Sequence, residues 1–143
     1  MLDKNLIRTK IELIQDELAH LVELADFSFD EIAADFYKYN TMERLLEKIV
    51  IRAIDINQHL LLESSTYKMA VPRTYAETFM MLADLSVYSK DFAVEISKSV
   101  GTRNILVHEY DKTDQNQIYS SIGDCLRDYH KYCDYILKFV EKA

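Results

Sequence analysis

Apolar residues recur along the first part of the chain with the period of an α-helix. Ile7, Ile11, Ile14, Leu18, Leu21 and Ala25 are separated by four, three, four, three and four residues, which places them on one helical face. Asp3, just before this stripe, is a suitable N-cap. The pattern predicts a long helix that packs against other helices.

Capping patterns divide the next part of the chain. Ser28 and Glu31 form a Ser-x-x-Glu capping box, which predicts a short helix from Asp30 to Tyr39. Asn40 and Glu43 offer a similar start to a second long helix, whose apolar stripe comprises Leu45 or Leu46, Ile49, Ala53, Ile56 and Leu60. Residues 64–73 collect Ser, Thr and the only Pro, so the helical pattern is expected to break there.

The second half of the chain shows three more helical segments. Thr74 and Glu77 form a capping box before a helix that contains Phe79, Met80 and Leu82. Ser86 to Ser89 links it to a helix striped by Phe92, Ile96, Val100 and Val107. Thr113 or Asp114 then caps the last helix, whose stripe is Ile118, Ile122, Cys125, Tyr129, Tyr132, Ile136 and Val140.

These segments predict one all-α domain over residues 1–143. The expected architecture is an up-and-down bundle of four main helices with one or two short ones. Only 2 of the 143 residues are Gly and 1 is Pro, which argues against a turn-rich β-fold and against a Gly-rich phosphate loop. The long helices also leave room for a second copy to pack along them, which is compatible with a dimer.

Composition and charge narrow the function classes. The longest uninterrupted apolar run is Phe79 to Ala83, far short of the ~20 residues of a membrane helix, so a soluble, cytoplasmic protein is expected. Cys125 and Cys133 are expected to be reduced thiols, and no metal ion or cofactor is predicted. The net charge of -7 argues against general coating of nucleic acid. A local phosphate site remains possible if Arg103 and Lys98 of two subunits, with Arg73 or Lys131, line one groove.

The segment from Thr102 to Asp111, TRNILVHEYD, crowds polar side chains at the end of an apolar stripe. On an unbroken helix Asn104 and His108 share a face, but Arg103 and His108 lie about 140° apart. The set converges only if the helix ends near His108 or if a second subunit contributes. Structurally, Arg103 and His108 could simply close a helix C-terminus through interhelical hydrogen bonds.

Arg103, Asn104, His108 and Tyr110 spell Arg-Asn-x-x-x-His-x-Tyr, which resembles the signature of the HepT-like toxins of the HEPN superfamily. Other segments that resemble this family contain Arg44, the residues Asp55, Ile56, His59 and Leu60, and the residues Pro72, Thr74, Tyr75, Phe79 and Leu82. The resemblance implies an all-α fold and a metal-independent endoribonuclease whose active site lies at a homodimer interface. It also implies an MntA-type nucleotidyltransferase antitoxin that neutralises the toxin by transferring AMP to Tyr110.

Residue chemistry agrees with cleavage of RNA. His108 is the natural general acid or base, since an unperturbed imidazole titrates near pH ~6.5, and two copies of it would supply an acid and a base. Arg103 has a charged fork that fits phosphate oxygens and stabilises charge in the transition state. Asn104 is expected to orient His108 or to contact RNA, and a 2',3'-cyclic phosphate is the expected product. Asp55 is assigned a supporting role in the groove, although a simple pair with His59, four residues on, is the stronger reading.

Two other hypotheses stay open. The chain could be a non-catalytic HEPN-fold binding module that docks on a nucleotidyltransferase and regulates it, or a purely structural helical scaffold. The scaffold leaves the polar cluster at residues 102–111 unexplained. Arg44 is expected to be a salt-bridge partner, and the tyrosines at positions 129, 132 and 135 are expected to pack in the core or at an interface.

Overall fold

The computed structural model describes residues 2–64, 71–108 and 112–143. These residues form helices only, in the order α1 (Lys4–Ala25), α2 (Phe29–Ala33), α3 (Phe36–Ser64), α4 (Tyr75–Asp84), α5 (Lys90–His108), α6 (Lys112–Ser120) and α7 (Ile122–Lys142). The long helices α1, α3, α5 and α7 confirm the four predicted main helices. The described residues form three shorter helices, α2, α4 and α6, where one or two were predicted.

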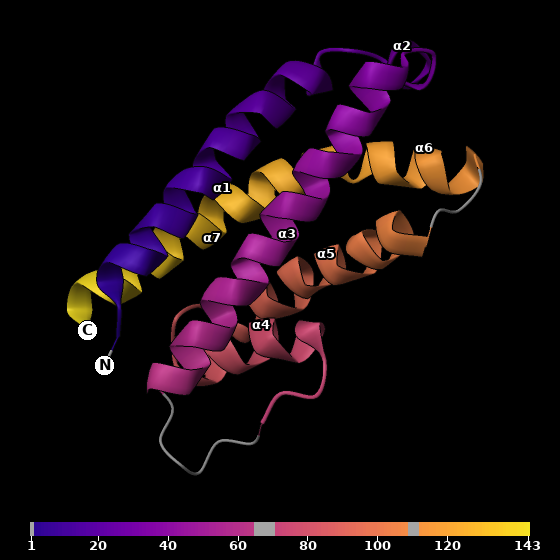
Figure 1. The fold of residues 1–143 in the computed structure, drawn as a ribbon. Coiled ribbons are helices and arrows are strands. Elements are labelled where there is room, and N and C mark those ends of the chain that lie inside the picture. Colours follow the sequence, from indigo (N-terminus) through magenta and orange to yellow (C-terminus); the bar gives the residue numbers. More distant parts are fainter. Residues whose placement is uncertain (1, 65–70, 109–111) are drawn as a thin grey trace.

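The long helices pack as a bundle in which α1 lies along both α3 and α7 (Figure 1). α4 packs against α5 and α3 on the other side of the bundle. The two termini lie at the same end of the molecule, where Lys4 Nζ donates a hydrogen bond of 2.7 Å to the Ala143 carbonyl (Figure 1). This arrangement leaves α5, which carries the polar segment, between α4 and α7.

The predicted apolar stripes form the core. Every member of the α3 and α6–α7 stripes is buried, and so are the first five members of the α1 stripe. Ala25 was predicted to close that stripe, but it is exposed and Leu24 is buried in its place. The reason is that α1 ends at Ala25, so the last residue of the helix lies beyond its packed face.

Three of the predicted caps are present. The Asp3 side chain accepts from the Leu6 N–H, the Ser28–Glu31 capping box is complete in both directions, and the Thr74 hydroxyl accepts from the Glu77 N–H. The predicted start of the second long helix at Asn40 is wrong, as is the continuous short helix from Asp30 to Tyr39. The Asp35 carboxylate accepts hydrogen bonds from the N–H groups of Tyr37 and Lys38, so α3 begins at Phe36.

The last predicted helix is interrupted at Ser121, which separates α6 from α7. The hydroxyls of Ser120 and Ser121 donate to the carbonyls of Gln117 and Ile118, at 2.9 and 2.6 Å. Such back-bonding by neighbouring serines weakens and bends a helix, and Gly123, two residues after Ser121, is a poor helix former. The apolar stripe nevertheless continues across the break, because Ile118 and Ile122 are both buried.

Candidate functional site

The helix that carries the polar segment ends within it. α5 runs from Lys90 to His108. A helix end near His108 is one of the two arrangements that would allow the polar side chains of the motif to come together. Tyr110 and the side chain of His108 lie outside the described part of the chain. Arg103 and Asn104, on the last two turns of α5, are described.

Arg103 has no charged partner among the residues that the structure describes. Among the described residues its guanidinium makes no hydrogen bond or ion pair, and its Nε atom is buried without a partner. The guanidinium carbon lies 5.4 Å from the centre of the Tyr75 ring, at the start of α4, which is cation–π distance. The interhelical hydrogen bonds that a purely structural role for Arg103 requires are therefore absent from its described contacts.

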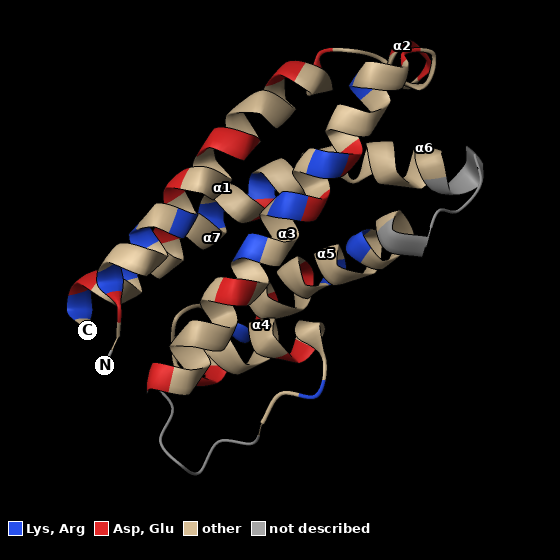
Figure 2. Ribbon diagram, viewed as in Figure 1, with Lys and Arg blue, Asp and Glu red and all other residues tan. Residues whose placement is uncertain are grey.

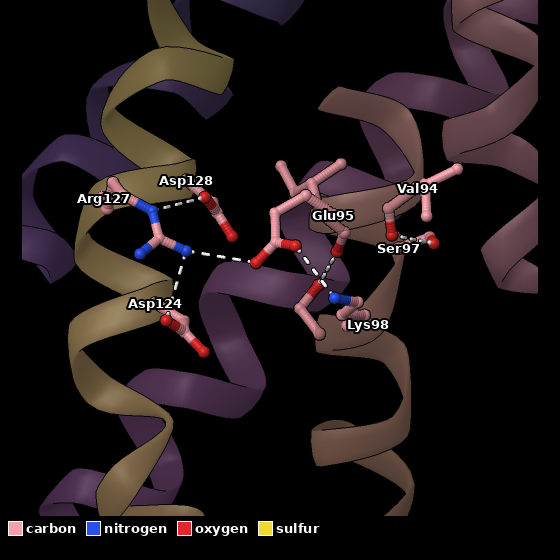
Figure 3. A network of polar contacts seen from close by, with 9 residues as sticks. Val94, Glu95, Ser97, Lys98, Asp124, Arg127 and Asp128 are labelled. Atoms are coloured by element: carbon pink, nitrogen blue, oxygen red, sulfur yellow. Dashed lines mark hydrogen bonds and ion pairs between the residues drawn. The ribbon is translucent and has the colours of Figure 1, made fainter. Parts of the chain in front are cut away.

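On its α7 side, Arg103 borders a small hollow rich in carboxylates. The hollow has a volume of about 60 Å³ and is lined by Glu95, Asp124 and Asp128 as well as by Arg103 itself. Figure 3 shows how the two nearby cations are engaged: Arg127 lies 3.1 Å from a carboxylate oxygen of each of Glu95, Asp124 and Asp128, and Lys98 lies 2.9 Å from Glu95.

These ion pairs and burial shift the pKa values of the charged groups around the hollow. The hydrogen bond from Lys98 and its charge hold the pKa of Glu95 below its usual range, and the same pair raises the pKa of Lys98. Burial raises the pKa of Asp128, against the opposing effect of Arg127. Lys98, which the sequence suggested for a phosphate groove, is thus paired with a carboxylate within this chain.

On its α4 side, the end of α5 borders a different groove. Gln58 of α3, Arg73, Tyr75 and Asn104 line it, and no Asp or Glu is among the described residues that do so. Sequence reasoning placed Arg73 in a possible phosphate groove, but it gave no role to Gln58 and did not connect Tyr75 with Arg103. Those connections come from the packing of α3 and α4 against α5 and have no signature in local spacing.

The other predicted residues lie elsewhere on the bundle. Asp55 is 3.5 Å from Lys10 of α1, and His59 Nε2 accepts from the backbone N–H of Asp3, so both residues contact the α1 side of α3. Neither lines the two hollows beside Arg103.

The predictions for Arg44 and for the tyrosines of the last helix are confirmed. Arg44 forms a salt bridge with Glu47, at 3.8 Å. Figure 2 shows acidic and basic positions interspersed along α3. Tyr129 and Tyr132 are fully buried, as predicted.

Among the residues whose positions are described, no group of three or more His, Cys, Asp and Glu side chains is arranged to hold a metal ion. None of the helices described combines the length and the apolar character needed to cross a membrane.

Comparison of the fold with solved structures gives close matches. The tri-AMPylated HEPN toxin of Shewanella oneidensis, solved in complex with its MNT antitoxin, superposes with a TM-score of 0.81 at 22% identity, covering 96% of this chain and 99% of that one. The cytosolic protein YutE of Bacillus subtilis, of unknown function, gives a TM-score of 0.72 at 19% identity, covering 94% and 91%. At these identities the likeness establishes the fold, a HEPN-type helical bundle.

Comparison of the sequences establishes the family. The family model for ribonuclease HepT-like proteins matches residues 14–136. The tRNA nuclease HepT of Aphanizomenon flos-aquae is 38% identical over 127 residues, which is 89% of this chain and 84% of that protein. The mRNA nuclease HepT of Shewanella oneidensis is 24% identical over 102 residues, covering 71% and 74%. The chain therefore belongs to the HepT-like ribonuclease family, as the sequence motif indicated.

Proposed function

We propose that this protein is the metal-independent endoribonuclease toxin of a toxin–antitoxin pair, active in the cytoplasm as a homodimer. The observation that carries the proposal is Arg103, a guanidinium with no charged partner among the described residues, one turn before the helix end at His108. A buried Arg nitrogen without a partner is costly unless a ligand completes it, and phosphate oxygens match its fork. Family membership supplies the reaction class.

The chemistry requires a base, an acid and a cation. One His108 takes the proton of the ribose 2'-OH, and the 2'-oxygen attacks the adjacent phosphorus. The bond from phosphorus to the 5'-oxygen breaks, and the His108 of the second subunit donates a proton to that oxygen. Arg103 stabilises the negative charge on the non-bridging oxygens of the transition state. The products are a 2',3'-cyclic phosphate and a 5'-hydroxyl end. Because each subunit has one His108, the acid and base pair is the chemical reason for a dimer.

Regulation follows from the same residues. An MntA-type nucleotidyltransferase antitoxin is the proposed partner, and Tyr110 the residue that receives AMP. An adenylyl group at Tyr110 adds bulk and negative charge close in sequence to Arg103, which blocks the RNA site and neutralises its cation. Asn104 orients His108 or contacts RNA. Asp55, on the α1 side of α3, is proposed only as a supporting residue.

We further propose that residues 1–143 act as a single HEPN-like domain. One continuous hydrophobic core, to which each of the helices from α1 to α7 contributes buried residues, supports this. Two buried free cysteines, Cys125 and Cys133, suit the reducing cytoplasm.

The test is cleavage of labelled total RNA by purified protein in EDTA. Intact mass first establishes that Tyr110 carries no AMP. Wild-type protein should cleave and leave 2',3'-cyclic phosphate ends, whereas His108→Ala should lose activity by about 10²- to 10⁴-fold with its helical circular dichroism unchanged. His130→Ala, which removes an exposed imidazole on α7, is the matched control and should cleave like the wild type. Absence of cleavage by unmodified wild-type protein would overturn the nuclease and favour a binding module that regulates a nucleotidyltransferase.

A further inference from the structure

The groove on the α4 side of α5 differs in charge from most of this acidic protein. The chain has 24 acidic and 17 basic residues, yet no carboxylate is among the described residues that line this groove. The hollow on the α7 side of Arg103 instead contains Glu95, Asp124 and Asp128. Lys98 also lines that hollow, and Arg127 pairs with its carboxylates, so on the α7 side three carboxylates face two cations. The groove on the α4 side, lined by Arg73 and by no described carboxylate, is therefore the more favourable side for a polyanion.

Arg73 provides a cation at the outer edge of the groove. Its side chain is exposed and makes no ion pair or hydrogen bond within the described chain. The adjacent carboxylate of Glu77 accepts from the backbone N–H of Arg73 at 2.6 Å, as part of the cap of α4. No described group occupies the guanidinium of Arg73, and we infer that it can contact a phosphate.

Tyr75 connects the groove with Arg103. Its ring lines the groove, is 41% exposed, and carries the Arg103 guanidinium at 5.4 Å. Its backbone carbonyl accepts from the Thr78 hydroxyl at 2.6 Å, and that hydroxyl accepts from Asn57 Nδ2 at 3.1 Å in the core. These hydrogen bonds hold the backbone of Tyr75 at the start of α4, the position from which its ring contacts Arg103.

Two side-chain amides complete the groove. Gln58 of α3 and Asn104 of α5 are both exposed and both line it. An amide offers a donor and an acceptor, which is the pairing that reads the edge of an unstacked base. In a duplex those base edges are paired, so the groove suits a single-stranded segment.

We propose that this groove binds the single-stranded RNA nucleotide next to the scissile phosphate, with Arg73 on a neighbouring phosphate and Gln58 and Asn104 facing its base. Tyr75 is a positioning residue that holds Arg103 against the scissile group. The proposal rests on the ribonuclease function proposed above. It makes two separable statements: Arg73 supplies affinity, and Tyr75 supplies the geometry of the reaction.

Steady-state cleavage of a short single-stranded RNA by unmodified protein separates the two. Arg73→Gln should raise KM with little change in kcat and should reduce the salt dependence of binding by about one phosphate contact. Arg8→Gln removes another exposed arginine, on α1, which makes no ion pair with the described residues, and is the matched control. Equal effects of Arg73→Gln and Arg8→Gln would overturn the phosphate contact.

For Tyr75, the expected readout is kcat. Tyr75→Leu removes the ring under Arg103 and should lower kcat by about 3- to 30-fold, whereas Tyr75→Phe keeps the aromatic face and should retain activity. Equal loss in both variants, or loss in neither, would overturn the positioning role.

For Gln58, the expected readout is the sequence of the cleavage sites. Gln58→Leu should change which base is preferred beside the cleaved bond when 5'-hydroxyl ends are sequenced. An unchanged preference would overturn base contact by Gln58.

A binding measurement distinguishes failure of this proposal from failure of the nuclease. In a His108→Ala background, fluorescence anisotropy reports the affinity for the same RNA without cleavage. If wild type does not cleave but Arg73→Gln still weakens binding, the groove is supported and the nuclease is wrong. If wild type cleaves and Arg73→Gln binds normally, the nuclease holds and the groove is wrong. Equal affinity for single-stranded and duplex RNA would also overturn the single-strand assignment.

Discussion

Glu17 Oε1 accepts a hydrogen bond of 2.5 Å from Arg52 Nε, which joins α1 to α3 in a partly buried position. The two side chains are 10% and 23% exposed, and the second carboxylate oxygen of Glu17 is buried with no partner among the described groups. Glu17 therefore depends on a single cation for its charge.

Removing that cation should be more damaging than removing the pair. Arg52→Ala leaves a buried carboxylate unpaired and is expected to lower the free energy of unfolding by about 3–5 kcal/mol. Glu17→Leu combined with Arg52→Met fills the same space with apolar groups, and its unfolding free energy should lie within about 1 kcal/mol of wild type or above it. Urea unfolding followed by circular dichroism measures both. A double variant that is less stable than Arg52→Ala would contradict the argument.

A buried polar chain links the core to the candidate site. The Tyr132 hydroxyl of α7 donates to Asn57 Oδ1 of α3 at 2.6 Å, and both side chains are fully buried. Tyr132→Phe leaves the amide oxygen without its donor and should lower the free energy of unfolding by about 1–3 kcal/mol. Tyr135→Phe is the matched control, because the half-buried Tyr135 hydroxyl makes no described hydrogen bond, and it should change stability by less than about 0.5 kcal/mol. Equal effects of the two variants would show that the hydrogen bond contributes nothing.

Much of the fold could be predicted from local sequence because its helices are defined by local rules. The stripes of α3 and α7 follow helical periodicity, and the caps at Asp3, Ser28 and Thr74 each depend on groups within three residues. Where two local signals compete, the sequence is ambiguous. Asn40 looked like a cap, but its amide donates to the Phe36 carbonyl inside α3, since Asp35 already caps that helix.

The candidate site was only partly predictable, for a physical reason. The reactive groups of the motif at residues 103–110 can be identified from the sequence, because their chemistry depends on the residue type alone. The partners of those groups depend on packing between helices: Arg103 meets Tyr75 of α4, whereas Lys98, five residues earlier on the same helix, meets Glu95 and lies among carboxylates that include those of α7. The pair of Lys98 with Glu95 is an i, i+3 contact that local spacing could have predicted, whereas no spacing along the chain connects Arg103 with Tyr75. The roles of His108 and Tyr110 stay predictions.

The capping box at α2 should make a measurable local contribution. Ser28 Oγ accepts from the Glu31 N–H at 3.2 Å, and Glu31 Oε1 accepts from the Ser28 N–H at 3.1 Å. Ser28→Ala should lower the free energy of unfolding by about 1 kcal/mol, because α2 also places the fully buried Ile32 in the core. Glu31→Gln keeps an acceptor at the third position and should remain close to wild type in urea unfolding. The reverse order of the two variants would contradict the box.

Alkaline pH should unfold the protein through its buried phenols. Burial raises the pKa of Tyr88, Tyr129 and Tyr132 above the ordinary value of 10.0, and burial together with Glu43 raises the pKa of Tyr39 to about 12. The phenols of the unfolded chain ionise first as the pH rises above ~10, so the contribution of these phenols to stability is constant below that pH and is lost above it. Of the 10 tyrosines, the exposed ones should develop tyrosinate absorbance smoothly, and the buried ones only together with the loss of helical circular dichroism. Titration of all tyrosines near pH ~10 with the helices intact would show that these phenols are accessible to solvent.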